Sequence, residues 1–183
     1  MPNVEEVARP LRTLVLGGAR SGKSGFAEGL AEAAEAVRYL ATSVPDPADL
    51  DFAARIAGHR ERRPAAWSVV ESADPAGVLT GEPTDGATLV DDIGTWLTAR
   101  IDARQAWEAP RGTIVPDCDA LVTAVAEYPC RLVIVSPEVG MGVIPATRSG
   151  RLFRDEIGAL NQRLAAVCDE VFLVVAGLPL RLK

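Results

Sequence analysis

The sequence has no apolar run of the roughly 18 residues that a membrane-spanning helix needs. It also lacks a signal-peptide pattern, because its first ten residues, MPNVEEVARP, are polar and partly acidic. Hydrophobic residues still make up 48% of the 183 residues, which is enough for one ordinary globular core. We therefore expect a cytoplasmic protein with a single domain over residues 11–183, preceded by an N-terminal extension over residues 1–10.

Cysteines are few, and basic residues are outnumbered by acidic ones. The three cysteines, Cys118, Cys130 and Cys168, do not have the spacing of a metal site, and an odd number cannot all pair. We expect them to be buried or free thiols in a reducing compartment. The net charge of −6 argues against a nucleic-acid partner, because phosphate backbones attract basic surfaces.

Short apolar runs alternate with helix-like stretches along the chain. Strands are expected at residues 13–16, 37–42, 68–71, 88–91, 131–136 and 170–176, with an edge strand at 180–182. Helices are expected at residues 23–34, 50–62 and 95–103, from a cap at Asp117 to about residue 128, and from a cap at Thr147 to about residue 168. This alternation predicts an α/β fold with a mostly parallel sheet flanked by helices. Ligands of such folds bind at the carboxyl ends of the strands.

The segment after the first expected strand matches a phosphate-binding loop: Gly, four residues, then Gly-Lys-Ser. Its residues are Gly17, Gly18, Ala19, Arg20, Ser21, Gly22, Lys23 and Ser24. Glycines let successive backbone N–H groups turn towards phosphate oxygens, and the N-terminus of the following helix adds partial positive charge. We expect Lys23 at the β- and γ-phosphates of GTP or ATP and the Ser24 hydroxyl at Mg²⁺. The loop predicts a P-loop NTPase fold of the RecA-like type.

Two carboxylates, Asp91 and Asp92, follow another apolar strand. An acidic residue at such a place in a P-loop enzyme holds Mg²⁺ or its water shell, so we expect at least one of them, Asp91, to serve the metal. The alternative is that both only cap the helix that follows. The Asn-Lys-x-Asp motif of regulatory GTPases and the Leu-Ser-Gly-Gly-Gln motif of transporter ATPases are both missing, which argues against those two classes.

The chain has a single histidine, His59, within Gly-His-Arg-Glu-Arg-Arg-Pro. A lone histidine is most often structural or simply exposed. Here three arginines, Arg60, Arg62 and Arg63, surround it, and guanidinium groups suit phosphate oxygens. A neutral imidazole could attack the α-phosphate of a nucleoside triphosphate and release pyrophosphate, with the arginines stabilising the developing charge.

Five stretches together resemble the bifunctional cobinamide kinase / cobinamide-phosphate guanylyltransferase family of cobalamin biosynthesis. They are the phosphate loop, Tyr-Leu-Ala-Thr-Ser at 39–43, the histidine segment at 54–67, Glu-Val-Gly-Met-Gly-Val-Ile-Pro at 138–145, and the stretch from 153 to 171 that contains Asn-Gln-Arg-Leu-Ala. The phosphate loop alone is common to many families. The histidine segment, the Val-Gly-Met-Gly loop and the Asn-Gln-Arg-Leu-Ala helix, in this order, are specific to this one, and the five stretches together span most of the chain.

The resemblance implies two reactions. A nucleoside triphosphate phosphorylates adenosylcobinamide, and GTP then guanylylates a histidine that passes GMP to the cobinamide phosphate, giving adenosylcobinamide-GDP. It further implies a homotrimer with Mg²⁺ and GTP or ATP as ligands. By position, the catalytic residues are His59 and Lys23. The other nucleotide-binding residues implied outside the phosphate loop are Ala41, Thr42, Ser43, Arg60, Glu61, Arg62, Arg63, Glu71 and Asp91.

This chain departs from the family pattern at three positions. Gly58 stands where the family often has a second histidine, Arg60 stands for a lysine, and Asp91 stands for a longer glutamate. The region 92–117 matches only loosely. The apolar loop 139–145 suits a large corrin ligand, or it is a tight structural turn. For Asn161, Arg163 and Asp169 we expect helix-surface or packing positions and assign no chemistry.

Two other functions remain open at this point. One is a small-molecule P-loop kinase in which His59 is inert. The other is a nucleotide-binding partner protein without catalytic activity. Labelling of the protein by α-labelled GTP distinguishes the guanylyltransferase from both.

Overall fold

The computed structural model describes residues 11–42 and 64–183. The expected extension over residues 1–10 and the expected helix over residues 50–62 lie outside the described residues. Among the described helices, none combines the length and the hydrophobicity needed to cross a membrane.

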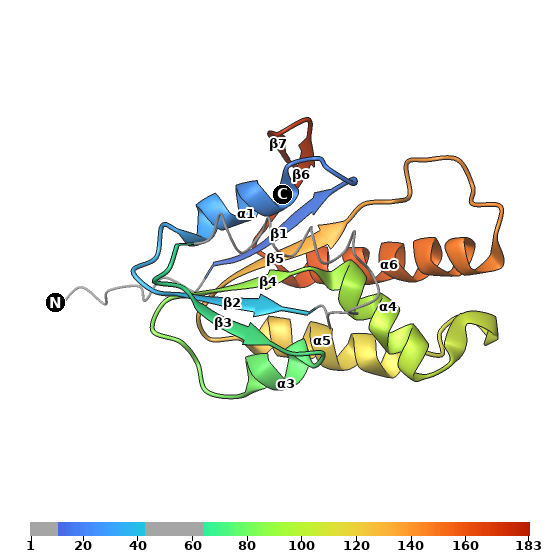
Figure 1. The fold of residues 1–183 in the computed structure, drawn as a ribbon, viewed down its shortest axis with the longest axis horizontal. Helices are drawn as coiled ribbons and strands as arrows, with labels where there is room; N and C mark the ends of the chain where they lie inside the picture. Colours follow the sequence, from blue (N-terminus) through green and yellow to red (C-terminus); the bar gives the residue numbers. More distant parts are fainter. Residues whose placement is uncertain (1–10, 43–63) are drawn as a thin grey trace, which may run out of the picture.

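Seven strands form one sheet in the order β3-β2-β4-β5-β1-β6-β7 (Figure 1). The strands are β1 (Arg12–Gly17), β2 (Val37–Ala41), β3 (Ser68–Glu71), β4 (Ala87–Asp91), β5 (Arg131–Pro137), β6 (Glu170–Val175) and β7 (Leu178–Arg181). Within residues 11–42 and 64–183, six strands pair in parallel, and only β7 runs antiparallel to its neighbour β6. The mostly parallel α/β fold expected from the sequence is confirmed.

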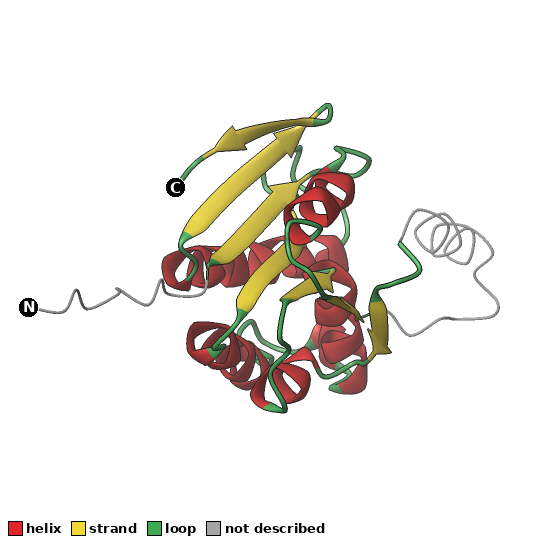
Figure 2. Ribbon diagram, turned by 90° about the vertical axis from the view of Figure 1, so that its left-hand side faces the viewer, coloured by secondary structure: helices red, strands yellow, loops and turns green. Residues whose placement is uncertain are grey.

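Helices cover both faces of the sheet (Figures 1 and 2). They are α1 (Lys23–Ala31), α3 (Pro75–Thr80), α4 (Ile93–Ala103), α5 (Val115–Glu127) and α6 (Arg148–Val167), with a short 3-10 turn η1 (Ala106–Glu108) after α4. Because strand side chains alternate between faces, neighbouring residues enter different cores. Val15 packs in the core beneath α1, whereas Leu14 and Leu16 pack in the larger core with α4, α5 and α6.

The expected helix starts were correct for α6 and wrong for α5. The Thr147 hydroxyl accepts the Gly150 N–H at 3.1 Å, so Thr147 caps α6 as expected. Helix α5 begins at Val115, and Asp117 lies within its first turn instead of capping it. The Pro116 ring favours the first turn of a helix, which moves the start before Asp117.

Other bounds differ from the sequence pattern in smaller ways. Helix α1 ends at Ala31, three residues earlier than expected, and α4 begins at Ile93, two residues earlier. Helix α3, which the sequence pattern did not predict, has six residues and is capped by the Asp74 carboxylate, which accepts the Gly77 N–H at 3.0 Å. A helix this short shows too few turns to produce a hydrophobic period.

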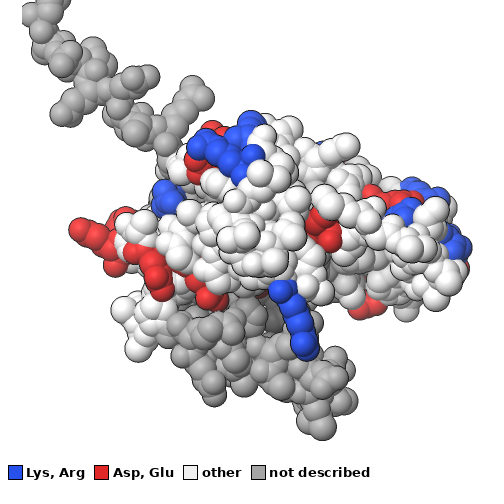
Figure 3. Space-filling model, turned by 90° about the horizontal axis from the view of Figure 1, so that it is seen from above, with Lys and Arg blue, Asp and Glu red and all other residues white. Residues whose placement is uncertain are grey.

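Among the described residues on the face seen from above in Figure 3, acidic and basic side chains lie in several small groups, and some opposite charges touch. These charges alone do not locate a ligand site. The candidate site is therefore located by backbone geometry at the carboxyl ends of the strands, where ligands of parallel sheets bind.

Candidate nucleotide site at the head of helix α1

The expected phosphate loop connects β1 to α1. Gly17 ends the strand and Lys23 begins the helix, with the Ser21 N–H donating to the Gly18 carbonyl at 3.3 Å. The residue before the helix is Gly22, which has no side chain to cap the first turn, and the Lys23 N–H donates to Ser21 Oγ at 3.3 Å. The helix dipole favours an anion at this end of α1.

Two glycines of this loop are required by their surroundings. Gly22 has φ of 92°, a left-handed conformation that side chains rarely adopt, and a Cβ on it would lie 3.0 Å from Gly177 Cα. A Cβ on Gly17 would lie 2.4 Å from Ser21 Oγ and 2.9 Å from the Val174 carbonyl oxygen. The Gly177 N–H also donates to the Ser21 carbonyl at 2.7 Å, so the turn after β6 supports the loop.

The side chain of Lys23 stays at the loop. Its ammonium group donates to the Gly18 carbonyl at 3.4 Å, and the residue is half-buried. The positive charge therefore lies at the same turn as the backbone N–H groups of the phosphate loop. An ammonium group and backbone amides at one turn suit a polyphosphate.

Asp91 at the end of β4 meets the first turn of α1. The Ser24 hydroxyl donates to Asp91 Oδ1 at 3.4 Å, and the Tyr39 hydroxyl donates to Asp91 Oδ2 at 2.8 Å. Hydroxyl and carboxylate oxygens are the ligands that Mg²⁺ prefers, with phosphate oxygens and water completing its shell. The pair Ser24 and Asp91 therefore fits Mg²⁺ on a bound nucleotide.

The Asp92 carboxylate binds helix α4 and not the phosphate loop. Its Oδ1 accepts the Thr95 N–H at 2.8 Å, which makes it the cap of α4. Its carbonyl accepts the Thr42 hydroxyl at 2.6 Å. The alternative that both aspartates act only as caps is thus wrong for Asp91, whose carboxylate faces the phosphate loop.

Two further expected nucleotide-binding residues, Ala41 and Thr42, lie next to Asp91. Ala41 is directly paired with Asp91 across β2 and β4. Thr42 is fully buried, and its hydroxyl also lies 2.9 Å from Thr95 Oγ1. The Thr42 side chain thus joins the end of β2 to α4.

Glu71 ends β3 at the same edge of the sheet but is not brought to the phosphate loop. Three strands, β2, β4 and β5, separate β3 from β1. At a strand spacing of about 4.8 Å this places Glu71 roughly 19 Å from Gly17. The remaining expected residues, namely Ser43, His59, Arg60, Glu61, Arg62 and Arg63, lie outside the described residues.

Sequence reasoning missed three residues that position the site. Tyr39 orients Asp91, Gly177 supports the phosphate loop, and Glu138 joins the loop to β5 by donating its N–H to the Gly17 carbonyl at 3.0 Å. Tyr39 lies in an apolar strand and is buried, and a buried tyrosine hydroxyl usually has a hydrogen-bond partner. A tyrosine within an apolar strand could therefore have indicated a polar partner on a neighbouring strand. The partners of Gly177 and Glu138 are more than a hundred residues away, and no local pattern shows them.

The cysteines do not contribute to this site. Burial raises the pKa of the Cys118 thiol to about 11 and that of the Cys168 thiol to about 12. Both stay protonated near neutral pH and are poor nucleophiles and metal ligands. All three thiols are free, two of them buried, as expected from the sequence. Within the described part of the chain, no group of three His, Cys, Asp or Glu side chains could hold a metal ion.

Comparison with known families gives the context of this geometry. The family model for cobinamide kinase / cobinamide phosphate guanyltransferase matches residues 13–182. The chain belongs to this family. The enzyme class that the sequence resemblance predicted, a bifunctional kinase and guanylyltransferase, is therefore confirmed.

Two curated relatives agree with this family. The chain is 42% identical over 180 residues to the bifunctional adenosylcobalamin biosynthesis protein CobP of Pseudomonas aeruginosa, covering 94% of this chain and 98% of the relative. It is 40% identical over 180 residues to the corresponding CobU of Salmonella typhimurium, covering 93% and 98%. The similarity therefore extends over essentially the whole length of both relatives.

Solved structures add information on the fold alone. A prototypical ATPase of a bacterial type III secretion system superposes with a TM-score of 0.57 at 10% sequence identity. The match covers 94% of this chain and 57% of that one. This supports the assignment to the P-loop ATPase fold.

Proposed function

We propose that this chain phosphorylates adenosylcobinamide with a nucleoside triphosphate and then transfers GMP from GTP to the product, giving adenosylcobinamide-GDP. The observation that carries the proposal is the phosphate loop, where Ser24 Oγ lies 3.4 Å from Asp91 Oδ1. The chain also matches the family model over residues 13–182. The family membership indicates the substrate, and the phosphate loop provides the binding site for the phosphates of the nucleotide.

In the kinase step, the hydroxyl oxygen of the aminopropanol arm attacks the γ-phosphorus. The bond from that phosphorus to the β–γ bridging oxygen breaks, and the hydroxyl proton is released. The N–H groups of the phosphate loop and Lys23 hold the β- and γ-phosphates and stabilise the charge that moves onto the leaving oxygen. Mg²⁺, held by Ser24 and Asp91, supplies further neutralisation of that charge when bound.

In the guanylyltransferase step, an imidazole nitrogen of His59 attacks the α-phosphorus of GTP, the bond to the α–β bridging oxygen breaks, and pyrophosphate leaves while the other ring nitrogen gives up its proton. A phosphate oxygen of cobinamide phosphate then attacks the same phosphorus, the phosphorus–nitrogen bond breaks, and His59 takes up a proton and leaves as a neutral imidazole. We assign Arg60, Arg62 and Arg63 to the phosphates by the resemblance. In support, the segment that holds them follows Thr42, which is hydrogen-bonded beside Asp91.

The remaining assignments rest on the same resemblance. We propose that Ala41, Thr42, Ser43, Glu61 and Glu71 contact the guanosine nucleotide, that the protein is a cytoplasmic homotrimer, and that Mg²⁺ accompanies GTP or ATP. Glu71 lies roughly four strand spacings from β1 within one chain, about 19 Å, so it would contact the base or ribose end of the nucleotide, not its phosphates.

The decisive experiment uses GTP labelled at the α-phosphorus. The wild-type protein should acquire acid-labile label, and addition of adenosylcobinamide phosphate should release it into a corrinoid product. Because His59 is the only histidine, a phosphoramidate on histidine can form at no other position of this chain. His59→Ala should show no label and should keep transfer from γ-labelled nucleotide to adenosylcobinamide.

Label that persists in His59→Ala would contradict the histidine intermediate. Kinase turnover without any label on the wild type would leave only the P-loop kinase function. Nucleotide binding without turnover on a corrinoid would refute both activities.

A further inference from the structure

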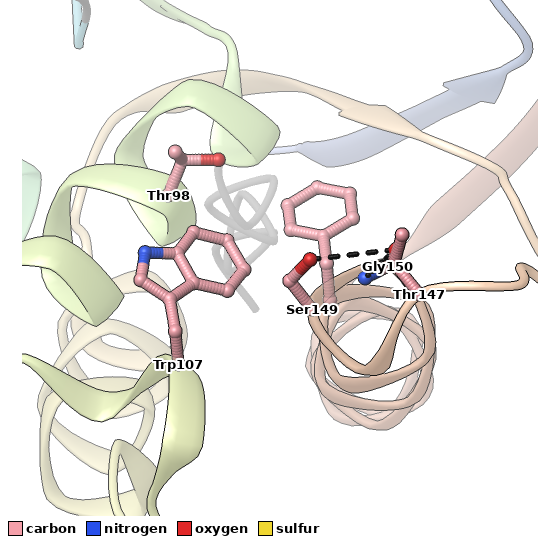
Figure 4. A pocket seen from close by; sticks show the side chains of 6 residues that line it. Thr98, Trp107, Thr147, Ser149 and Gly150 are labelled. Atoms are coloured by element: carbon pink, nitrogen blue, oxygen red, sulfur yellow. Dashed lines mark hydrogen bonds between the residues drawn. The ribbon is translucent and has the colours of Figure 1, made fainter.

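A pocket lies between α4, the η1 turn and the first turns of α6, beyond the ends of the strands. Its volume is about 580 Å³. The lining residues are Thr98, Trp107, Thr147, Ser149, Gly150 and Phe153. Figure 4 shows the Trp107 indole and Thr98 on one side, and Thr147, Ser149 and Gly150 at the start of α6 on the other. The proposed mechanism uses none of these residues.

The walls of this pocket are apolar and held in place. The rings of Trp107 and Phe153 pack against the main core and remain partly exposed. The Trp107 indole N–H donates to Asp102 Oδ1 at 2.5 Å. The Arg148 guanidinium donates to the Trp107 carbonyl at 2.7 Å and to the Glu108 carbonyl at 3.0 Å, which joins the η1 turn to α6. A rigid aromatic wall loses little entropy when a ligand binds.

An exposed apolar loop runs from the phosphate loop to the pocket. It begins at Glu138, which is bonded to Gly17, and it ends at Thr147 in the pocket wall. Its side chains Met141, Val143 and Ile144 are 77%, 95% and 65% exposed. In Figure 1 this loop connects the end of β5 to the start of α6. Large apolar side chains exposed together mark a binding surface more often than a fold requirement.

The length of α6 sets the distance from the strand ends to the pocket. Asn161 on α6 is bonded to Ser136 at the end of β5, at 2.6 Å. Phe153 and Ser149 precede Asn161 by eight and twelve residues, so they lie about 12 Å and 18 Å farther along the helix at 1.5 Å per residue. A ligand that reaches from the phosphate loop to this pocket is therefore large.

We propose that the pocket and the loop bind the corrin macrocycle of the substrate, remote from the hydroxyl that is phosphorylated. This rests on the proposed function. A corrin is a broad ring rimmed with methyl groups and amide arms, so it presents apolar faces to Trp107 and Phe153 and amides to the hydroxyls of Thr98 and Ser149. Binding energy from this remote part of the substrate holds the reacting hydroxyl at the phosphate loop.

The test is the steady-state kinetics of phosphoryl transfer for Trp107→Ala and Phe153→Ala. We expect kcat/KM for adenosylcobinamide to fall about tenfold or more, as for the loss of a buried aromatic contact, with an unchanged KM for the nucleotide. Dicyanocobinamide, which keeps the macrocycle but not the adenosyl group, should show the same loss. The small acceptor 1-amino-2-propanol, which has no macrocycle, should show none.

The double variant Met141→Ser, Val143→Ser guards against misfolding, because both side chains are exposed, and it should also weaken corrinoid use. Val69→Ala, an exposed valine on β3, is the matched control and should behave as wild type. The proposal is overturned if Trp107→Ala, Phe153→Ala and the double serine variant all keep wild-type kinetics with corrinoids. It is also overturned if the KM for the nucleotide rises instead, or if the loss appears with adenosylcobinamide but not with dicyanocobinamide. A wild-type protein that phosphorylates no corrinoid would refute the proposed function itself.

Discussion

Asp91 and Asp92 are adjacent in the chain, yet their carboxylates serve different elements. Residues of β4 alternate between the two faces of the sheet, and Leu89 packs in the core beneath α1. Asp91, two residues later, points to the same side and meets Ser24 of α1. Asp92 leaves the strand and caps α4. The period of a strand thus decides which of two identical residues reaches the nucleotide.

Removing the Tyr39 hydroxyl tests the role of Asp91. Tyr39→Phe deletes the bond to Asp91 Oδ2 and leaves the buried ring, so the carboxylate loses its orienting partner. We expect the Mg²⁺ concentration for half-maximal nucleotide turnover to rise roughly tenfold, as is typical when a group that orients a metal ligand is lost. A magnesium titration at saturating nucleotide measures this.

Tyr128→Phe is the matched control for that titration. Tyr128 follows α5, and its hydroxyl lies 2.7 Å from Thr88 Oγ1 of β4 and accepts from Arg38 of β2 at 2.9 Å, away from the Asp91 carboxylate. It should lower stability and leave the magnesium dependence unchanged. Equal magnesium dependence in wild type and Tyr39→Phe would show that Tyr39 does not orient a metal ligand.

Among the elements, the end of β5 is held from two sides. On one side, the Glu138 N–H donates to the Gly17 carbonyl beside the phosphate loop. On the other side, Asn161 of α6 is buried, accepting the Ser136 hydroxyl at 2.6 Å and donating to the Pro137 carbonyl at 3.0 Å. Of the two expected positions for Asn161, helix surface or packing, the structure shows the second. Its side chain also connects α6 to the strand that adjoins the phosphate loop.

Asn161→Ala should therefore affect both stability and turnover. It leaves the fully buried Ser136 hydroxyl without its partner, which costs about 1–3 kcal/mol of unfolding free energy. It also frees the end of β5, so kcat should fall. Urea unfolding and kinetics measure the two effects. Asp74→Ala, which removes the remote α3 cap, should lose about 1 kcal/mol with unchanged kinetics. If Asn161→Ala also kept wild-type kcat, its role would be structural only.

For the whole molecule, a bound nucleotide should stabilise the folded state. A ligand at 100 times its Kd adds about 2.7 kcal/mol to the unfolding free energy, because it binds only the folded chain. We expect GTP with Mg²⁺ to raise the urea midpoint accordingly, and Lys23→Ala to lose most of that rise. Lys183, at the carboxyl terminus, is the only other lysine, so Lys183→Ala is the matched control and should keep the full rise. An undiminished rise in Lys23→Ala would contradict the assigned site.

The phosphate loop, the capped start of α6 and the positions of six parallel strands were all predictable from the sequence. Each depends on short-range physics: glycine conformations, a hydroxyl cap, or an apolar run of strand length. The start of α5 was wrong because Asp117 is a good cap by type, while Pro116 just before it already belongs to the helix. The magnesium, nucleotide and histidine assignments remain predictions.

The tertiary structure alone decided the strand order, the pairing of Ser24 and Tyr39 with Asp91, and the pocket formed by Trp107 and Phe153. These arrangements join residues tens of positions apart. Their free energy comes from packing and hydrogen bonds that form only when distant segments meet. A local pattern specifies an element and its faces, but which face meets which neighbour is determined by the assembled core.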